Sequence, residues 1–546
     1  MFHPGWRAQA LGSLDKAFDL VVIGGGITGC GVFFDAAQRG LRVLLVEQGD
    51  IASGTSSRSS KLLHGGLRYL RNLQFQVTRE SCRERDLQIE LNPHLVTPLS
   101  WLYPTYVGDR PSGKKVALGL WIYDRLTRNA EKFRRLSREE MESFAPGSRQ
   151  EDLDQAFLYR DARVDDARLT TAVAATGFAY GGRVLTYARV EDGRRGADGN
   201  LRGVVLRDLL TGKTHEVDAP LIVNATGPWT DKVRHALGID GVRVRPSRGS
   251  HLIFDRTKVP VEGAMTMASP DDGRPVFFIP HPEGVLVGTT DLFHSGDLLD
   301  PRPTEDEVGY MLRTLAVAFP QAPPRREDIR GAFAGVRPVL DSGTDDPSKA
   351  SREEAVWFEQ GLLSVAGGKL TTWRATAEEV VDKALKRLPA EVSRRASPCA
   401  TAGTPLAGLA PVDLDERLAK SHDLEPSLAG PMARRLGSLA WTACHRAEAH
   451  DLRPVREDLD VSRAELRAHL SFGAVATLSD LLLRRVRLGM WRPDLARSLA
   501  PQLADLWSAE MDTDFEAELE RFESEVVAWS LDGVEARGVE ALGTAP

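Results

Sequence analysis

Three glycines and one glutamate near the start of the chain have the types and the spacing that bind a dinucleotide. Gly24, Gly26 and Gly29 follow the apolar residues 20–23, and Glu47 comes later at the end of a second apolar run. Gly24 would permit a tight turn, Gly26 would let the backbone approach a pyrophosphate, and Gly29 would let a helix pack closely. An acid in the place of Glu47 is expected to accept a ribose hydroxyl.

Two histidines and one lysine have the chemistry to move a proton. Imidazole titrates near neutral pH and accepts a proton from an alcohol, which makes His64 and His251 candidates for a general base. Lys369 could share this role if nearby cations lower its pKa. The alternative for each histidine is a structural place in the core. Residue type alone leaves the base open among these three.

The glycines and the glutamate need a strand, a helix and a second strand to hold them. Residues 20–23 are expected as the first strand, and residues 30–39 as a helix whose N-terminal amides would face the phosphates. Gly40 would stop that helix, and residues 41–47 would form a second, parallel strand. The alternative is a glycine-rich helix cap. The order of strand, glycine turn, helix, strand and acid favours a βαβ unit.

Two later segments also run from an apolar strand into a glycine turn. Residues 221–224 lead into the first of these turns, and residues 362–365 lead into the second. The helix expected after the second turn would offer its N-terminus to an anion. The residues of the two turns that we expect at the ligand are Ala225, Gly227, Gly368, Leu370 and Thr371.

A long small and hydroxylic run, residues 54–60, follows Glu47 and leads into a basic and aromatic stretch, residues 61–70. Here the sequence resembles the FAD-dependent, aerobic-type glycerol-3-phosphate dehydrogenases. In that family this serine-rich loop passes along the flavin, and the Arg-Tyr pair after Gly-Gly-Leu faces the substrate. The resemblance covers residues 18–388 closely and residues 410–529 less closely.

The resemblance implies an α/β fold in three parts: a Rossmann-like FAD-binding domain of the glutathione-reductase/D-amino-acid-oxidase type, an antiparallel-sheet substrate domain, and a C-terminal helical domain. Spaced strands between residues 244 and 291 agree with the antiparallel layer. The expected boundaries are 18–78, 158–243 and 330–395 for the FAD-binding domain, 79–157 and 244–329 for the substrate domain, 396–411 for a linker, and 412–530 for the helical domain.

The resemblance also implies a site that combines a base with forked cations. Guanidinium groups suit a phosphate dianion because each offers paired donors. His251 is favoured as the base, since its Gly-Ser-His segment matches a ligand-facing strand of the family. The expected catalytic residues are His251, Arg337 and Lys369. The expected substrate contacts are Arg68, Tyr69, Thr290 and Arg352. The flavin contacts added to the glycine turns are Thr55, Ser56, Lys61 and His64.

The implied reaction is the oxidation of sn-glycerol 3-phosphate to dihydroxyacetone phosphate with FAD, the electrons passing to a membrane quinone. Three alternatives stay open. The first is a glycerol-3-phosphate oxidase that reduces oxygen, and the second is an amine or amino-acid oxidase of the same fold, which would have less use for three arginines. The third is a flavin-binding regulatory protein without turnover.

Composition argues against other classes of protein. The formal net charge is −7, from 70 Lys and Arg against 77 Asp and Glu, which speaks against a general nucleic-acid binder. The four cysteines, Cys30, Cys82, Cys399 and Cys444, are far apart and form no C-x-x-C pair. We therefore expect a reducing compartment and no metal site.

No apolar run is long enough for a membrane span, and residues 1–18 lack the apolar core of a signal peptide. A membrane quinone is dissolved in the bilayer. We therefore expect a cytoplasmic protein in peripheral contact with the anionic inner face of the cell membrane. Residues 114–128 place apolar residues at helical spacing between basic ends. This predicts either a helix packed in the substrate domain or a surface that touches anionic lipid. Assembly as a homodimer stays open.

Overall fold

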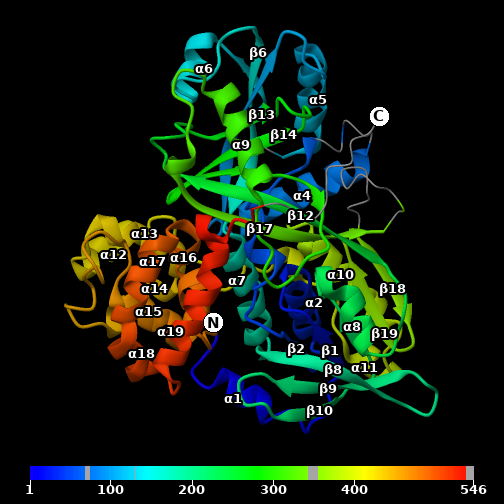
Figure 1. The fold of residues 1–546 in the computed structure, drawn as a ribbon. Coiled ribbons are helices and arrows are strands. Elements are labelled where there is room, and N and C mark those ends of the chain that lie inside the picture. The colour runs from blue at the N-terminus through cyan, green and yellow to red at the C-terminus, as the bar shows by residue number, and fades with distance from the viewer. Residues whose placement is uncertain (68–69, 71–73, 129–130, 342, 344–353, 537–546) are drawn as a thin grey trace.

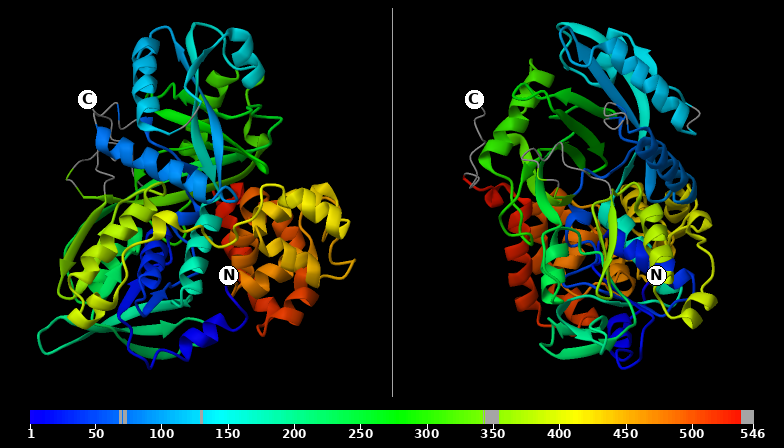
Figure 2. Two further views of the ribbon diagram at one scale, coloured as in Figure 1. Left: turned by 180° about the vertical axis from the view of Figure 1, so that it is seen from behind. Right: turned by 90° about the vertical axis from the view of Figure 1, so that its right-hand side faces the viewer.

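The chain folds into three parts that lie against one another in the computed structural model (Figure 1). The structure describes residues 1–67, 70, 74–128, 131–341, 343 and 354–536. In Figure 1 a parallel sheet with its helices lies below a larger sheet, and the helical C-terminal part, yellow to red, lies beside them. Figure 2 shows the same arrangement from behind. The predicted fold class, an α/β fold with a second sheet and a helical domain, is confirmed.

The lower part, which we call the nucleotide domain, is built on six strands in the order β18-β19-β11-β1-β2-β7. Neighbouring strands are parallel, except that β18 runs antiparallel to β19. β1 and β2 are buried along their whole length, as expected where a parallel sheet is covered on both faces. The strands are β1 (Leu20–Ile23), β2 (Val43–Val46), β7 (Arg183–Leu185), β11 (Ile222–Asn224), β18 (Ala355–Glu359) and β19 (Leu362–Ala366).

Alternate side chains of β1 pack on different layers. Leu20 and Val22 belong to the core formed with three helices, whereas Val21 and Ile23 belong to the core formed with a three-stranded sheet. The three helices are α2 (Ile27–Gln38), α7 (Asp166–Ala179) and α10 (Trp373–Leu385). The small antiparallel sheet is β8 (Ala188–Arg195), β9 (Leu201–Asp208) and β10 (Thr214–Asp218). β1, α2 and β2 thus form the predicted βαβ unit.

The upper part is a ten-stranded sheet with the path β16-β12-β15-β14-β13-β4-β6-β3, to which β17 is added beside β12 and β5 beside β6. Its pairs are antiparallel apart from β13 with β4. The strands are β3 (Leu62–Leu63), β4 (Val96–Tyr106), β5 (Arg134–Leu136), β6 (Leu153–Val164), β12 (Val244–Phe254), β13 (Ala264–Ala268), β14 (Pro275–His281), β15 (Gly284–Gly288), β16 (Leu292–Phe293) and β17 (Ile329–Leu340). The helices of this part are α4 (Phe75–Leu91), α5 (Gly113–Leu126), α6 (Arg138–Phe144) and α9 (Glu305–Ala318).

Three strands of the upper sheet come from stretches that the sequence placed in the FAD-binding domain. β17 pairs with β12 along its whole length, from Val244 opposite Leu340 to Phe254 opposite Ile329. β3 and most of β6 also belong to this sheet. The expected boundaries therefore need correction at 62–63, 158–164 and 330–340. A local pattern shows that a segment is a strand, but it does not show which distant strand is its partner.

The helices of the helical domain are short. α13 (Pro426–Leu436) ends at Gly437, whose φ is 56°, and α15 (Arg463–Phe472) ends at Phe472. A π-helical turn, η5 (Asp480–Arg485), follows later. The helices are α12 (Leu414–His422), α13 (Pro426–Leu436), α14 (Leu439–Arg446), α15 (Arg463–Phe472), α16 (Leu488–Trp491), α17 (Pro493–Leu499), α18 (Ala504–Glu510) and α19 (Phe515–Val526).

The expected linker, residues 396–411, contacts both the end of α4 and the nucleotide domain. The amide of Leu406 donates to Asn92 Oδ1 over 2.8 Å, and the amide of Ala407 donates to Thr176 Oγ1 over 2.9 Å. These hydrogen bonds fix the path by which the chain enters the helical domain.

Candidate active site

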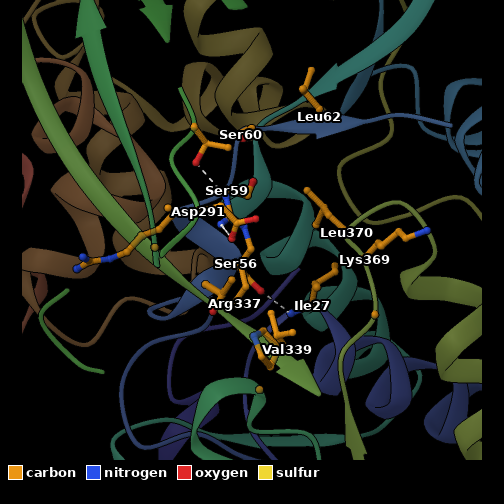
Figure 3. A pocket seen from close by; sticks show the side chains of 18 of the residues that line it. Ile27, Ser56, Ser59, Ser60, Leu62, Asp291, Arg337, Val339, Lys369 and Leu370 are labelled. Atoms are coloured by element: carbon orange, nitrogen blue, oxygen red, sulfur yellow. Dashed lines mark hydrogen bonds and ion pairs between the residues drawn. The ribbon is translucent and has the colours of Figure 1, made fainter. Parts of the chain in front are cut away.

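A cavity of about 2970 Å³ opens where the two sheets and the helical domain meet. Its wall includes the carboxyl ends of β1 and β2, most residues of the serine-rich loop (residues 54–60), and side chains of β12 and β17. The carboxyl ends of parallel strands are where α/β sheets bind their ligands. Figure 3 shows part of this wall from close by.

The glycine turn after β1 has no room for side chains. A Cβ at position 24 would lie 2.6 Å from the carbonyl oxygen of Ala225, and Gly24 has a φ of 112°. A Cβ at position 29 would lie 1.9 Å from the carbonyl oxygen of Gly24. A Cβ at Gly26 would lie 3.2 Å from Ser56 Oγ. Backbone atoms therefore form this part of the cavity wall, as a ligand that approaches the main chain requires.

Glu47 lines the cavity at the end of β2. Its carboxylate accepts hydrogen bonds from the amides of Gly25 over 2.6 Å and Gly49 over 2.7 Å. Burial raises the pKa of this carboxyl, and the two amide hydrogen bonds act in the opposite direction. Glu47 thus ties the glycine turn to the second strand. Its contact with a ribose stays a prediction.

The serine-rich loop is fixed to both sheets. Ser56 Oγ accepts from the amide of Ile27 over 2.9 Å, at the N-terminus of α2 (Figure 3). Thr55 Oγ1 donates to the carbonyl of Val336 on β17 over 2.5 Å. Both hydroxylic residues line the cavity, so the loop is held in place along the cavity wall.

Lys61 has a different environment from the one expected. The side chain is fully buried and is absent from the cavity wall; Nζ lies 2.6 Å from Asp166 Oδ1 and 3.1 Å from the carbonyl oxygen of Ser57. Burial, together with the charge of Arg487, lowers the pKa of Lys61 to about 8. This lysine therefore supports the loop from behind rather than from the ligand side.

His251 lies on β12 with its imidazole in the cavity wall. Nε2 is 2.9 Å from Ser60 Oγ, and the ring stacks on Phe333 with centroids 5.0 Å apart. Nδ1 is buried and has no hydrogen-bond partner among the described residues. Burial, and then the charges of Arg337 and Lys61, lower the pKa of His251 well below its usual range. The imidazole is therefore neutral at pH 7 and able to accept a proton.

Arg337 lies on β17, next to β12, and its guanidinium is held by a loop. Nη1 lies 3.2 Å from Asp291 Oδ1, and Nη2 donates to Thr289 Oγ1 over 2.9 Å. A Cβ at position 249 would lie 2.3 Å from Nη2, so Gly249 provides the space for the guanidinium. Both Arg337 and His251 line the cavity, which brings the expected cation and the favoured base into one site.

The hydroxyl of Thr290 makes its hydrogen bonds inside the upper part of the fold. Oγ1 donates to Glu307 Oε1 over 2.6 Å and accepts from the amide of Ser250 over 2.9 Å. Its neighbours Thr289 and Asp291 line the cavity instead. The sequence did not single out Thr289, Asp291 or Ser60, although Ser60 lies in the hydroxylic run, residues 54–60.

The turn after β19 forms another part of the wall. His64, Gly368, Lys369, Leu370 and Thr371 line the cavity, and the amide of His64 donates to Thr371 Oγ1 over 3.1 Å. The side chain of Lys369 extends away from Ser56 and Ile27 in Figure 3.

Ala225 and Gly227, in the turn after β11, line the cavity as well. Three of the expected substrate contacts, Arg68, Tyr69 and Arg352, lie outside the described residues. Within the described part of the chain, no group of three or more His, Cys, Asp or Glu side chains could hold a metal ion.

Comparisons with known proteins agree on both parts of the chain. A family model described as FAD dependent oxidoreductase matches residues 19–396, and one described as the C-terminal domain of alpha-glycerophosphate oxidase matches residues 399–518. The aerobic glycerol-3-phosphate dehydrogenase of Staphylococcus haemolyticus is 38% identical over 398 residues, which cover 72% of each chain. That of Staphylococcus saprophyticus is 34% identical over 505 residues, which cover 90% of each chain.

A solved structure, that of the glycerol-3-phosphate dehydrogenase from Bacillus halodurans complexed with FAD, matches 97% of this chain and 98% of its own with a TM-score of 0.78 and 29% identity. The L-alpha-glycerophosphate oxidase from Mycoplasma pneumoniae, with FAD bound, covers 67% of this chain and 94% of its own with a TM-score of 0.54 and 19% identity. The second match concerns the fold alone.

Proposed function

This chain belongs to the family of FAD-dependent, aerobic-type glycerol-3-phosphate dehydrogenases, and we propose that it oxidises sn-glycerol 3-phosphate to dihydroxyacetone phosphate and passes the electrons to a membrane quinone. One observation carries the reaction. A neutral imidazole, His251, and a guanidinium, Arg337, share a cavity with a glycine turn that admits no side chain.

The residues of the cavity fit FAD. Backbone atoms of the Gly24 turn form the wall at the carboxyl end of β1, where a pyrophosphate needs close approach. The carboxylate of Glu47 lies at the end of β2, where a ribose needs an acceptor. Thr55 and Ser56 line the space between this end and the site of His251. FAD, when bound, supplies the acceptor for the hydride of the alcohol carbon.

His251 takes the proton of the substrate hydroxyl in this proposal. Nε2, which contacts Ser60 Oγ at the wall, is the nitrogen that accepts it, and Nδ1 then carries the ring hydrogen. The lowered pKa keeps the imidazole unprotonated before each turnover. His64 and Lys369 stay as alternative bases, and both line the same cavity.

Arg337 binds the phosphate end of the substrate. Asp291 and Thr289 fix the orientation of its guanidinium, so fewer rotamers are lost when an anion is bound. We propose Arg68 and Arg352 as further cations of this clamp, with a hydroxyl contact from Tyr69. Thr290 is not retained as a substrate contact, because its hydroxyl is already bonded to Glu307 and Ser250 away from the cavity. A dianion held by several guanidinium groups would separate glycerol 3-phosphate from uncharged glycerol.

The decisive experiment is anaerobic reduction of the purified protein by a panel of phosphorylated and plain polyols. Glycerol 3-phosphate should bleach the flavin absorbance, whereas glycerol at the same concentration should leave it unchanged. An amine or an amino acid that bleaches the flavin faster than glycerol 3-phosphate would assign the site to an amine oxidase. Failure of every compound in the panel would favour a flavin-binding regulatory protein.

The electron acceptor is tested on the reduced protein. Oxidation by a short-chain quinone should outpace oxidation by dissolved oxygen. Rapid oxidation by oxygen alone, with formation of hydrogen peroxide, would make the protein an oxidase.

We propose that α5 makes the contact with the membrane. Val116 and Leu120 on one side of the helix are buried, whereas Leu118 and Trp121 are 59% and 49% exposed. The guanidinium of Arg125 lies over the Trp121 ring at 4.5 Å. None of the helices in the described part of the chain is long and apolar enough to cross a bilayer. An exposed apolar and basic face of this kind can lie in the lipid headgroups at the inner face of the cell membrane.

Vesicle co-sedimentation tests this contact. The protein should pellet with anionic vesicles at low salt and partly dissociate at high salt, because each basic residue adds about 1 kcal/mol of attraction that salt screens. A variant with glutamine at the exposed positions Lys114, Lys115, Arg125 and Arg128 should stay in solution and still be reduced by substrate. The matched control neutralises four exposed cations of the helical domain, Arg417, Lys420, Arg446 and Arg453.

Equal sedimentation of the two variants would remove α5 from the membrane surface. Absence of binding at every salt concentration would replace the quinone with a soluble acceptor.

A further inference from the structure

The helical domain contributes directly to the wall of the FAD cavity, although the reaction described above gives this domain no role. Its residues come from the π-helical turn η5 and from the end of α19 and the residues that follow it. The six that line the cavity are Leu483, Arg484, Ser524, Glu525, Ala528 and Trp529.

Two arginines of the π-helical turn clamp one carboxylate of the nucleotide domain. Arg484 Nε lies 2.6 Å from Asp50 Oδ2, and Arg485 Nη2 lies 2.8 Å from Asp50 Oδ1. Asp50 lies in the turn that follows β2 and Glu47, and all three charged groups of the clamp are buried. Arg484 and Arg485 are consecutive residues of the π-helical turn, and both side chains reach this one carboxylate.

A third arginine of the same segment holds the serine-rich loop. Arg487 Nη2 lies 3.1 Å from the carbonyl oxygen of Ser57 and 3.0 Å from Asp166 Oδ1. The other oxygen of Asp166 accepts from the amide and the hydroxyl of Ser59, over 3.0 and 2.7 Å. The helical domain therefore reaches two places on the cavity, the end of β2 and the loop beside it.

Arg484 keeps one donor group for a ligand. Nε is engaged with Asp50, and Nη2 lies 2.7 Å from Asp480 Oδ1. Nη1 makes no hydrogen bond to any described residue, and its nearest acidic partner is Glu525 Oε2 at 3.9 Å. Because Arg484 lines the cavity, this fixed guanidinium offers its remaining N–H groups there.

The place of Arg484 identifies the part of the ligand that it meets. An acid at the end of the second strand of a βαβ unit binds the ribose of an adenosine, and Glu47 has that position here. Asp50, the ion-pair partner of Arg484, lies just after this strand and lines the same cavity. Adenosine offers ribose oxygens and ring nitrogens as acceptors for a guanidinium.

We propose that the helical domain is a clasp on the cofactor, in which Arg484 binds the adenosine half of FAD from outside the nucleotide domain and Arg487 fixes the serine-rich loop along it. The inference rests on FAD as the cofactor. It gives the C-terminal domain a function in retaining FAD.

The test uses the Arg484→Gln holoenzyme. Asp50 keeps Arg485 in this variant, and Asp480 keeps the hydroxyl of Tyr187 at 2.6 Å and the amide of Ala476 at 2.8 Å. Neither carboxylate is left without a partner, so the fold should survive. The equilibrium dissociation of FAD is measured by the flavin fluorescence that appears on dilution, and ADP is added as a competitor for the adenosine half.

We expect the Kd of FAD to rise about ten- to hundredfold, since one hydrogen bond from a charged group is lost. The Ki of ADP should rise by the same factor. The matched control is Arg435→Gln, because Arg435 is a largely buried arginine of the same domain, with its side chain 10% exposed, that pairs with Glu465 and does not line this cavity. The control should leave both constants unchanged.

Three results would overturn the clasp: an unchanged Kd, a higher Kd with an unchanged Ki of ADP, or an equal effect of Arg435→Gln. If Arg484→Gln fails to fold, Arg484→Lys decides, because it keeps the cation beside Asp50 and removes the forked donors. Its Kd should rise too, and a wild-type value would end the proposal. A wild-type protein without FAD would instead refute the proposed function itself.

Discussion

The glycine turn after β1 presents backbone atoms to the cavity, whereas the pocket around Arg337 presents side chains. In the turn, a Cβ added at Gly24 or Gly29 would clash with backbone carbonyl oxygens. These oxygens can move only if the backbone of the fold moves with them. In the pocket, an added atom at Gly249 would meet side-chain atoms, the guanidinium of Arg337 and the hydroxyl of Thr289. The two ends of one cavity therefore differ in what they tolerate. Changes in the turn should remove the cofactor, and changes in the pocket should slow the reaction.

The largest effect is expected from Gly29→Ala. Its Cβ would lie 1.9 Å from the Gly24 carbonyl oxygen, so the turn must open or the helix must move. We expect a loss on the order of 4 kcal/mol or more, and purified protein without yellow colour. Gly403→Ala is the control, because no atom lies within 4 Å of its Cβ. A full complement of FAD in the Gly29 variant would disprove the account of the turn.

Arg337→Lys should come next, and it should spare the cofactor. A lysine keeps the charge but not the paired donors, so about 2–4 kcal/mol of transition-state binding should be lost. Steady-state kinetics should show this loss in kcat/KM at an unchanged flavin content. Arg330→Lys, on the same strand and paired with Asp255, is the control that should keep wild-type kinetics. Wild-type kinetics of the Arg337 variant would remove this residue from the site.

A smaller effect is expected from Gly249→Ala. The added methyl would displace the guanidinium of Arg337, whose Nη2 lies 2.3 Å from the Cβ position. Since a side chain can shift where a backbone cannot, about tenfold in kcat/KM should be lost through a 1–3 kcal/mol strain. Flavin content and the affinity for ADP should not change. Loss of FAD from this variant would show that the two ends of the cavity are not separable.

The smallest effect concerns pH. The pKa of His251 lies well below 6.5, chiefly through burial and then through the charges of Arg337 and Lys61. The base is therefore unprotonated down to pH values below the usual histidine range, and kcat/KM should fall only there. In Arg337→Gln one of the two charges is gone, so the acid limb of the remaining activity should move to higher pH. An acid limb that stays in place would assign the base to another residue.

The same contrast explains what the sequence could predict. The glycines, the strand and Glu47 lie within one βαβ unit, so their contacts follow from short spacing, and the structure places them together. His251 and Arg337 were found through family motifs, and the register of β12 with β17 places both at the cavity. Thr290 and Lys61 have hydroxylic or basic side chains that suit a ligand. Their contacts with Glu307 and Asp166 across the fold could not be read from a local pattern.

The arginines of residues 484–487 show the limit most clearly. They fall within residues 410–529, where the resemblance to the family is less close, and no local pattern in them indicates a partner. Their partners, Asp50 and Asp166, are more than 300 positions away in the chain, with sequence separations of 435 and 321. Only the packing of the helical domain on the nucleotide domain reveals them.

The serine-rich loop contacts the cofactor side, the helical domain and the proposed base. The binding of cofactor and the binding of substrate are therefore thermodynamically linked. Ser56 is bonded to the helix that faces the cofactor, Ser57 to Arg487, and Ser60 to His251. A ligand that orders this loop lowers the entropy that the next ligand must remove. FAD should therefore raise the affinity for the phosphorylated alcohol, and by reciprocity the alcohol should raise the affinity for FAD by the same factor. An enzyme that is short of substrate would then also be the one that loses its flavin first.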